Sequence, residues 1–222
     1  MKLSCPRPVT LPRMDEGRIG VDESGKGDYF GPLVIAACYV GPEHLAELEG
    51  VRDSKRLTDG RAHQLAATIR RTCPHAVVAI GPAKYNELYA KMRNLNRLLA
   101  WGHARAIESV LEQHTADLIV SDQFADAETV KKRLFELGRR VRLESRVRAE
   151  RDIAVAAASV LARAEFLRRL HALSGRWETP LHKGAGPPVV EAGRRFVRQH
   201  GSEKLSEVAK LHFKTTKDVI GG

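Results

Sequence analysis

The sequence is poor in the features that mark membrane, secreted and zinc-binding proteins. No apolar run approaches the roughly 20 residues that span a bilayer, and the segment before Arg18 has prolines and charges but no apolar block. The three cysteines, Cys5, Cys38 and Cys73, show no CxxC spacing, which argues against a disulfide framework or a zinc site. We therefore expect a soluble, cytoplasmic protein whose thiols are buried or incidental.

The size of the chain favours one domain. Its 222 residues can bury a substantial core, and a hydrophobic content of 43% is near the average of globular proteins. We find no internal repeat and no low-complexity segment. We expect an N-terminal extension over residues 1–17 and one catalytic domain, with a helical C-terminal region, over 18–222.

Charge is distributed unevenly along the chain. Residues 1–130 hold 16 bases and 17 acids, whereas residues 131–222 hold 21 bases and 10 acids. The whole net charge of +10 therefore resides in the C-terminal part. This favours a polyanionic partner, above all nucleic acid, although an ordinary solvated basic surface is the alternative.

Hydrophobic periodicity alternates between the two regular structures and predicts a layered α/β domain. Short apolar runs predict strands at 18–23, 33–40, 75–81, 117–121 and 140–144, the first two forming a hairpin. Longer runs with helical spacing predict helices at 42–50, 58–71, 82–112 with a break near 94–96, 127–137, 152–170 and 187–199. Within 152–170 the apolar residues surround the whole helix, so we expect that helix to be buried.

Two adjacent carboxylates stand in the segment Gly20–Pro32, GVDESGKGDYFGP, where a strand gives way to glycines. Neighbouring residues of a regular strand point to opposite faces, so Asp22 and Glu23 can serve one centre only if the chain bends after Asp22. Ser24 and Gly25 can supply that bend. A phosphate-binding P-loop is excluded because GxxxxGK[ST] is not matched, and a charged β-turn is the structural alternative.

Two further acids are candidates for the same site. Asp122 directly follows an apolar strand, and ligand sites form at the C-terminal ends of parallel strands. It could instead cap a helix, although Asp126 stands nearer the expected helix start. Glu150 precedes the buried helix, where a carboxylate is favoured by the helix dipole whether or not it binds a metal, and Asp152 is the better candidate for the cap.

The segment Asp22–Leu33 closely resembles the opening motif of type 2 ribonucleases H, and its Gly-Lys-Gly resembles the HIII branch, where HII relatives usually have Gly-Arg-Gly. The resemblance extends over about residues 18–217. Further matching motifs lie at 53–57, 94–104, 122–124, 155–163, 183–186 and 210–214. The resemblance implies a ribonuclease-H-like fold, a mixed five-stranded sheet flanked by helices. Members of this branch usually carry an N-terminal substrate-binding domain, but only about 17 residues precede the motif here.

By motif position, the resemblance implies catalytic, metal-binding acids at Asp22, Glu23, Asp122 and Glu150. It implies substrate-binding residues at Ser24, Gly25, Lys26, Gly27, Lys55 and Lys183. Four oxygen ligands without a His/Cys cluster suit two Mg²⁺ or Mn²⁺ ions rather than zinc. The expected partner is an RNA–DNA hybrid, with no organic cofactor, no membrane, and a monomer as the default.

The expected activity is endonucleolytic hydrolysis of the RNA strand of the hybrid by two-metal-ion catalysis, leaving 5′-phosphate and 3′-hydroxyl ends. Three alternatives remain open. The chain could be an HII-like enzyme that incises at single ribonucleotides in DNA, a non-catalytic hybrid-binding protein, or a nuclease of the same fold that acts on DNA junctions. Clustered acids argue against the non-catalytic alternative, because unneeded carboxylates would only repel a phosphate backbone.

Overall fold

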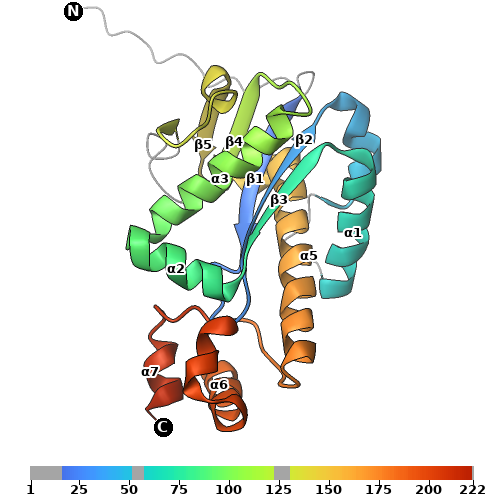
Figure 1. Ribbon diagram of the computed structural model, residues 1–222. Coiled ribbons are helices and arrows are strands. Elements are labelled where there is room, and N and C mark those ends of the chain that lie inside the picture. The colour runs from blue at the N-terminus through green and yellow to red at the C-terminus, as the bar shows by residue number, and fades with distance from the viewer. Residues whose placement is uncertain (1–16, 52–57, 123–130, 222) are drawn as a thin grey trace, which may run out of the picture.

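A mixed sheet forms the centre of the molecule (Figure 1). The computed structural model describes residues 17–51, 58–122 and 131–221. Its five-stranded sheet has the order β3-β2-β1-β4-β5. The strands are β1 (Arg18–Ser24), β2 (Leu33–Val40), β3 (His75–Ile80), β4 (Leu118–Asp122) and β5 (Arg142–Arg146). The predicted fold class, a ribonuclease-H-like sheet flanked by helices, is confirmed.

The pairing of the strands determines which side chains meet at the end of the sheet. β2 is antiparallel to β1 and β3, whereas β1, β4 and β5 are parallel. The β1–β2 pair is the expected hairpin, with Asp22 opposite Ala36 and Glu23 opposite Ile35. The last residue pair of β1 and β4 joins Val21 to Ser121, and the next residue on each strand is an aspartate.

Helices cover both faces of the sheet (Figure 1). α1 (Asp59–Thr72) and α5 (Ile153–Arg176) lie on one face, and α3 (Leu95–Leu111), preceded by α2 (Pro82–Met92), lies on the other. The C-terminal elements gather at the end of the molecule to which the β1 arrow points. These C-terminal elements are α6 (Pro187–His200), η5 (Ser202–Glu207) and α7 (Thr215–Ile220). Three further 3₁₀ helices in the described residues are η1 (Pro42–Leu48), η3 (Gly138–Arg140) and η4 (Ala149–Arg151).

Local sequence signals set most helix ends. The side chains of Thr58 and Asn94 accept hydrogen bonds from backbone N–H groups in the first turns of α1 and α3. Asp152 does the same at α5, accepting from Ala154 N at 3.0 Å, which confirms the predicted cap. Proline occupies the first turn of α2 and of α6, where its missing N–H costs nothing.

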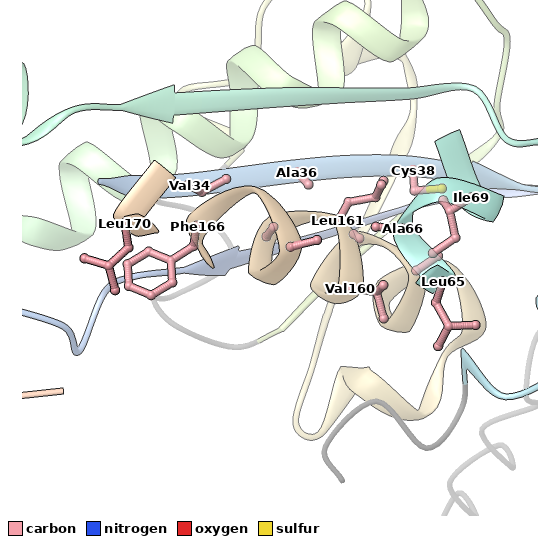
Figure 2. Close-up of a cluster of buried hydrophobic side chains, with 14 of the residues drawn as sticks. Val34, Ala36, Cys38, Leu65, Ala66, Ile69, Val160, Leu161, Phe166 and Leu170 are labelled. Atoms are coloured by element: carbon pink, nitrogen blue, oxygen red, sulfur yellow. The ribbon is translucent and has the colours of Figure 1, made fainter. Parts of the chain in front are cut away.

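Two cores, one on each face, hold the layers together. Figure 2 shows side chains of α5 and α1 packed against β2, including Leu161, Phe166 and Leu65. The opposite core joins α3 to Ile19, Val21 and Ile35. The alanines in the first half of α5 allow that helix to approach the sheet closely. At Gly20 an added Cβ would lie 2.0 Å from the backbone carbon of Ala154.

Most predicted elements are confirmed, and the exceptions have local causes. Strand 33–40 has the predicted bounds, and the break between α2 and α3 lies where it was expected. The helix predicted at 127–137 is wrong in its second half, because residues 132–137 form turns and irregular chain. Residues 127–130 lie outside the described part. Its apolar spacing comes from Leu134, which is buried beneath the turn, rather than from a helix face. β5 lies two residues later than predicted, and η5 and α7 were not predicted.

No helix in residues 17–51, 58–122 or 131–221 has the length and apolar character needed to cross a membrane.

Gly20→Ala should destabilise the protein by roughly 3 kcal/mol, because the new methyl group would overlap backbone atoms of α5 that cannot move independently. The measurement is the free energy of urea unfolding. Gly175→Ala, within α5 itself and with nothing near the new methyl group, is the matched control, and it should be neutral or stabilising by up to about 1 kcal/mol. Equal stability of the two variants would contradict the close packing of β1 on α5.

Candidate active site

The site begins with two aspartates at the ends of neighbouring parallel strands. Val21 of β1 is paired with Ser121 of β4, and the next residues on the two strands are Asp22 and Asp122. Residues in register on parallel strands direct their side chains to the same face of the sheet. That face is the one covered by α5, because Asp22 is hydrogen-bonded to Ser159 and Asp122 accepts from the backbone just before α5. The register therefore brings two predicted metal ligands together.

The environment of Asp22 disfavours its charged form. Burial, followed by the charge of Glu23, raises the pKa of Asp22 to about 6, against the lowering effect of its hydrogen bonds. One of those bonds comes from Ser159, and another is the backbone N–H of Glu23, which donates to Asp22 Oδ1 at 2.8 Å. A carboxylate held this way gains from any cation that binds beside it.

Glu23 lies on the opposite face, and the bend expected after Asp22 is not there. β1 stays in regular register with β2 through Ser24, so Asp22 and Glu23 alternate as in any strand. The positive φ of 86° comes only at Gly25. Both acids lie at the very end of the strand, which keeps their carboxyl groups near each other even though they start on different faces.

Two partners hold the carboxylate of Glu23. His103 of α3 is fully buried, and its Nε2 lies 3.0 Å from Glu23 Oε2. Lys26 Nζ lies 3.3 Å from Glu23 Oε1. Burial alone would raise the pKa of Glu23, but the hydrogen bond and charge of His103, with those of Lys26, lower it below its usual value. The charged form is therefore favoured at Glu23 and disfavoured at Asp22.

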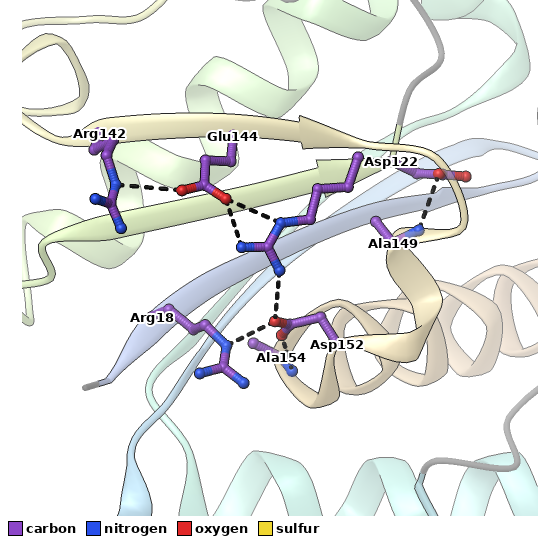
Figure 3. A network of polar contacts seen from close by, with 8 residues as sticks. Arg18, Asp122, Arg142, Glu144, Ala149, Asp152 and Ala154 are labelled. Atoms are coloured by element: carbon purple, nitrogen blue, oxygen red, sulfur yellow. Dashed lines mark hydrogen bonds and ion pairs between the residues drawn. The ribbon is translucent and has the colours of Figure 1, made fainter. Parts of the chain in front are cut away.

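Asp122 connects the sheet to the segment that carries Glu150. Ala149 N donates to Asp122 Oδ1 at 3.3 Å (Figure 3). The next residue is Glu150, which is partly buried and lies in η4. A second contact anchors the same segment, because Asp152 Oδ2 lies 2.7 Å from Arg18 Nε at the start of β1. Arg146 reaches Asp152 and Glu144 from β5. Glu150 is thus held close to Asp122 by its neighbours in the chain.

The glycine-rich loop after β1 passes close to α5. A Cβ on Gly25 would lie 2.2 Å from the backbone oxygen of Pro32 and 2.9 Å from the ring of Phe166, so only glycine fits there. Gly27 is exposed with open space around it. Ser24 is partly buried at the end of β1, directly beside the acids. The loop therefore presents backbone groups next to the predicted metal ligands.

The two predicted lysines of the substrate set have different outcomes. Lys55 lies outside the described residues. Lys183 is half-exposed, and its Nζ lies 2.6 Å from Asp59 Oδ2 at the start of α1. Arg163 of α5 reaches the other oxygen of Asp59 at 2.9 Å. The neighbour of Lys183, Gly184, connects this segment to the glycine-rich loop, because its N–H donates to Asp28 Oδ1 at 2.6 Å.

Two partners of the acids had no role assigned from the sequence. His103 and Ser159 both lie in segments that match the family motifs, and both face inward from helices that pack on the sheet. A polar residue on the apolar face of a predicted helix is the signal that could have identified them.

The donor set fits hard divalent cations. The acids supply oxygen atoms only, which Mg²⁺ and Mn²⁺ prefer. The pKa of Asp22 is raised by burial and by the charge of Glu23, and a bound cation would offset both effects. In the part of the chain that the structure describes, no three His, Cys, Asp or Glu side chains are gathered closely enough to hold a metal ion. Glu23, held by His103 and Lys26 on the α3 face, would have to turn toward the aspartates to complete the set.

Asp22→Asn should stabilise the metal-free protein at pH 7 by about 2 kcal/mol. The pKa of Asp22 rises on folding, so the folded state binds its proton more tightly and this group lowers stability as pH rises from about 4 to 6. The gain should be complete above pH 6 and vanish near pH 4. Urea unfolding in EDTA measures it, with Asp117→Asn at the exposed start of β4 as control. A destabilised Asp22→Asn protein at pH 7 would contradict the proposed burial of charge.

Comparison with known proteins gives the geometry a family. The family model of ribonuclease HII matches residues 19–216. The chain is 46% identical to ribonuclease HIII of Protochlamydia amoebophila (strain UWE25), over 91% of this chain and 68% of that protein. It is 45% identical to ribonuclease HIII of Chlamydia pneumoniae, over 92% of this chain and 70% of the relative.

A solved structure has a similar fold. The crystal structure of Bst-RNase HIII in complex with Mn²⁺ superposes with a TM-score of 0.87 at 35% identity, covering 93% of this chain and 70% of that one. The resemblance drawn from the motifs is confirmed. The chain therefore belongs to the type 2 ribonucleases H, and within them to the ribonuclease HIII branch.

Proposed function

We propose that this ribonuclease H hydrolyses the RNA strand of RNA–DNA hybrids endonucleolytically with two divalent ions, leaving 5′-phosphate and 3′-hydroxyl ends. The observation that carries the proposal is the β1–β4 register, in which Asp22 and Asp122 take matching positions near the ends of neighbouring parallel strands, on one face. We propose residues 18–222 as one catalytic domain and the cytoplasm as its location. A monomer without organic cofactor is the simplest state that would act in this way.

Asp22, Glu23, Asp122 and Glu150 would hold the ions. The Mn²⁺ bound in the Bst-RNase HIII crystal structure supports divalent metal use, and Mg²⁺ has the same preference for oxygen ligands. Ions bound here would supply Lewis acidity, which makes water a stronger nucleophile at neutral pH and offsets charge on the leaving 3′-oxygen.

The side chains of the chain itself prepare this chemistry. Asp22 has to lose a proton before it can act as a ligand, and its pKa of about 6 allows that at neutral pH. His103 orients Glu23 from the buried side, as partners of metal ligands commonly do. Ser159 and the backbone N–H of Ala149 each bond one aspartate, which limits the positions that the two carboxylates can take.

Selection of RNA requires a group that contacts the 2′-hydroxyl. Ser24 and the backbone groups of Gly25, Lys26 and Gly27 lie at the end of β1, beside the acids, and would make that contact. Lys55 and Lys183 would bind phosphates. For Lys183 this requires release or sharing of its ion pair with Asp59, which an incoming phosphate could exchange.

Wild-type protein with Mg²⁺ or Mn²⁺ should cut the RNA strand of a labelled RNA–DNA hybrid, and Asp22→Asn should lower the rate at least about a thousandfold because the central ligand is lost. Double-stranded RNA and a DNA junction should remain intact. Asp117→Asn is the control, because Asp117 is exposed and lies just before β4, at the opposite end of that strand from Asp122. This variant should keep wild-type activity.

The pattern of products separates the alternatives. A DNA duplex with one embedded ribonucleotide that is cut faster than the hybrid would support HII-like incision. Binding without cleavage would support a hybrid-binding protein. Equal cleavage by wild type and Asp22→Asn would assign the activity to another site or a contaminant and remove the proposal.

Hybrid binding should weaken at least about tenfold between 50 and 200 mM salt, because basic residues of the C-terminal part would replace counterions on the phosphates. Fluorescence anisotropy with metal-free protein and a labelled hybrid measures the dissociation constant. A dissociation constant that stays constant over this range would contradict an electrostatic contribution from that part.

A further inference from the structure

A lysine of the C-terminal part is buried against the glycine-rich loop. Lys210 has no exposed surface, and its Nζ donates to the backbone oxygens of Asp28 at 2.6 Å and Gly31 at 2.8 Å. The oxygen of Phe30 lies at 3.4 Å. All three contacts are with one segment of main chain, so the ammonium binds the turn itself rather than a carboxylate.

Such a position is costly for a charged group. Burial lowers the pKa of Lys210 to about 7, although the charge of Asp28 acts in the opposite direction. The ring of Tyr85, 5.8 Å from Nζ, gives only a weak attraction. Replacing a buried ammonium by an apolar side chain of similar size is often neutral or favourable for stability. The local contacts therefore point to a task for the charge other than filling the core.

The turn that Lys210 binds follows directly on the groups proposed to meet the substrate. Residues 28–31 come after Ser24–Gly27, and Gly27 has open space around it. Gly25 packs against Pro32 and Phe166, and beyond it the loop leads directly into the turn that carries the three carbonyl groups. The position of that turn therefore affects the position of the whole loop.

Main-chain bonds attach the same turn to two C-terminal segments. Tyr29 N donates to Gly184 O, Lys210 N donates to Tyr29 O, and Gly31 N donates to Val208 O, each at 2.8–2.9 Å. An isolated bridge pairs Phe30 with Ala209. Lys210 is the side chain that adds charge-assisted bonds to this attachment.

We propose that Lys210 is a positioning residue: its ammonium, bound by the carbonyl groups of residues 28, 30 and 31, holds the glycine-rich loop where Ser24–Gly27 meet the sugar of the RNA strand. The proposal rests on the proposed function. It makes the C-terminal part a component of the catalytic site rather than only a surface for phosphates. Lys210 acts through the loop and does not touch the substrate or the metal ligands.

The test compares Lys210→Met, Lys210→Ala and Lys91→Met, the last an exposed lysine on α2, outside the basic C-terminal part, that serves as the matched control. Steady-state cleavage of the hybrid gives kcat and KM, a Mn²⁺ titration gives metal affinity, and urea unfolding gives stability. Lys210→Met should lose about ten- to a hundredfold in kcat, with KM and Mn²⁺ affinity within about threefold of the control, because misplacement of substrate affects the transition state most.

Chemical rescue separates positioning from a purely structural role. Ethylammonium or propylammonium should enter the space left in Lys210→Ala and restore kcat at least about fivefold in a saturable manner, while leaving Lys91→Met unchanged. Hydrogen exchange of residues 25–31 should be faster in Lys210→Ala and slow down again with the amine. Lys210→Gln, which keeps two donors, replaces either variant that does not fold.

A folded Lys210 variant with the kcat of the control would overturn the proposal, as would a loss of kcat that no alkylammonium ion restores in Lys210→Ala. Failure of the wild-type protein to cut the hybrid would instead remove the proposed function, which makes the two failures distinguishable.

Discussion

The parallel pairing of β1 with β4 is the constraint on which the rest of the site depends. Because the two strands are in register, Asp22 and Asp122 follow the paired residues Val21 and Ser121 and lie side by side on the face covered by α5. Every other feature adjusts to that pair. α5 must come close enough for Ser159 to reach Asp22, and Gly20 with the alanines of α5 makes that approach possible. A side chain at position 20 would thus separate the helix from the acids it serves.

The site places charge where the fold by itself would not favour it. Burial and the nearness of Glu23 raise the pKa of Asp22, so the metal-free protein carries a cost at neutral pH that bound cations would offset. A similar cost arises at Lys210, whose buried ammonium is bound by main-chain oxygens of the loop. Buried charges that are unfavourable for stability are expected at functional sites rather than in a core selected only for stability.

Much of the fold could be predicted because the sequence patterns are strong and local. The run Leu33–Val40 can only be a buried strand, and Asp152 has the side chain that caps a helix. The acids were predicted from their motif. The partner of Glu23 was not, since nothing in the sequence places His103 opposite a residue 80 positions earlier. The expected bend after Asp22 was wrong because β2 keeps β1 extended to Ser24, a long-range effect that local glycines do not reveal.

The central claim, that Asp22 and Asp122 share a divalent cation, can be tested most directly by diffraction. A crystal grown with Mn²⁺ and measured at the manganese absorption edge would locate the ions by anomalous scattering, independently of any activity. The account predicts a strong peak within about 2.5 Å of a carboxylate oxygen of Asp22 and of Asp122 alike. Peaks bound to only one of these two acids, or located elsewhere on the protein, would contradict it.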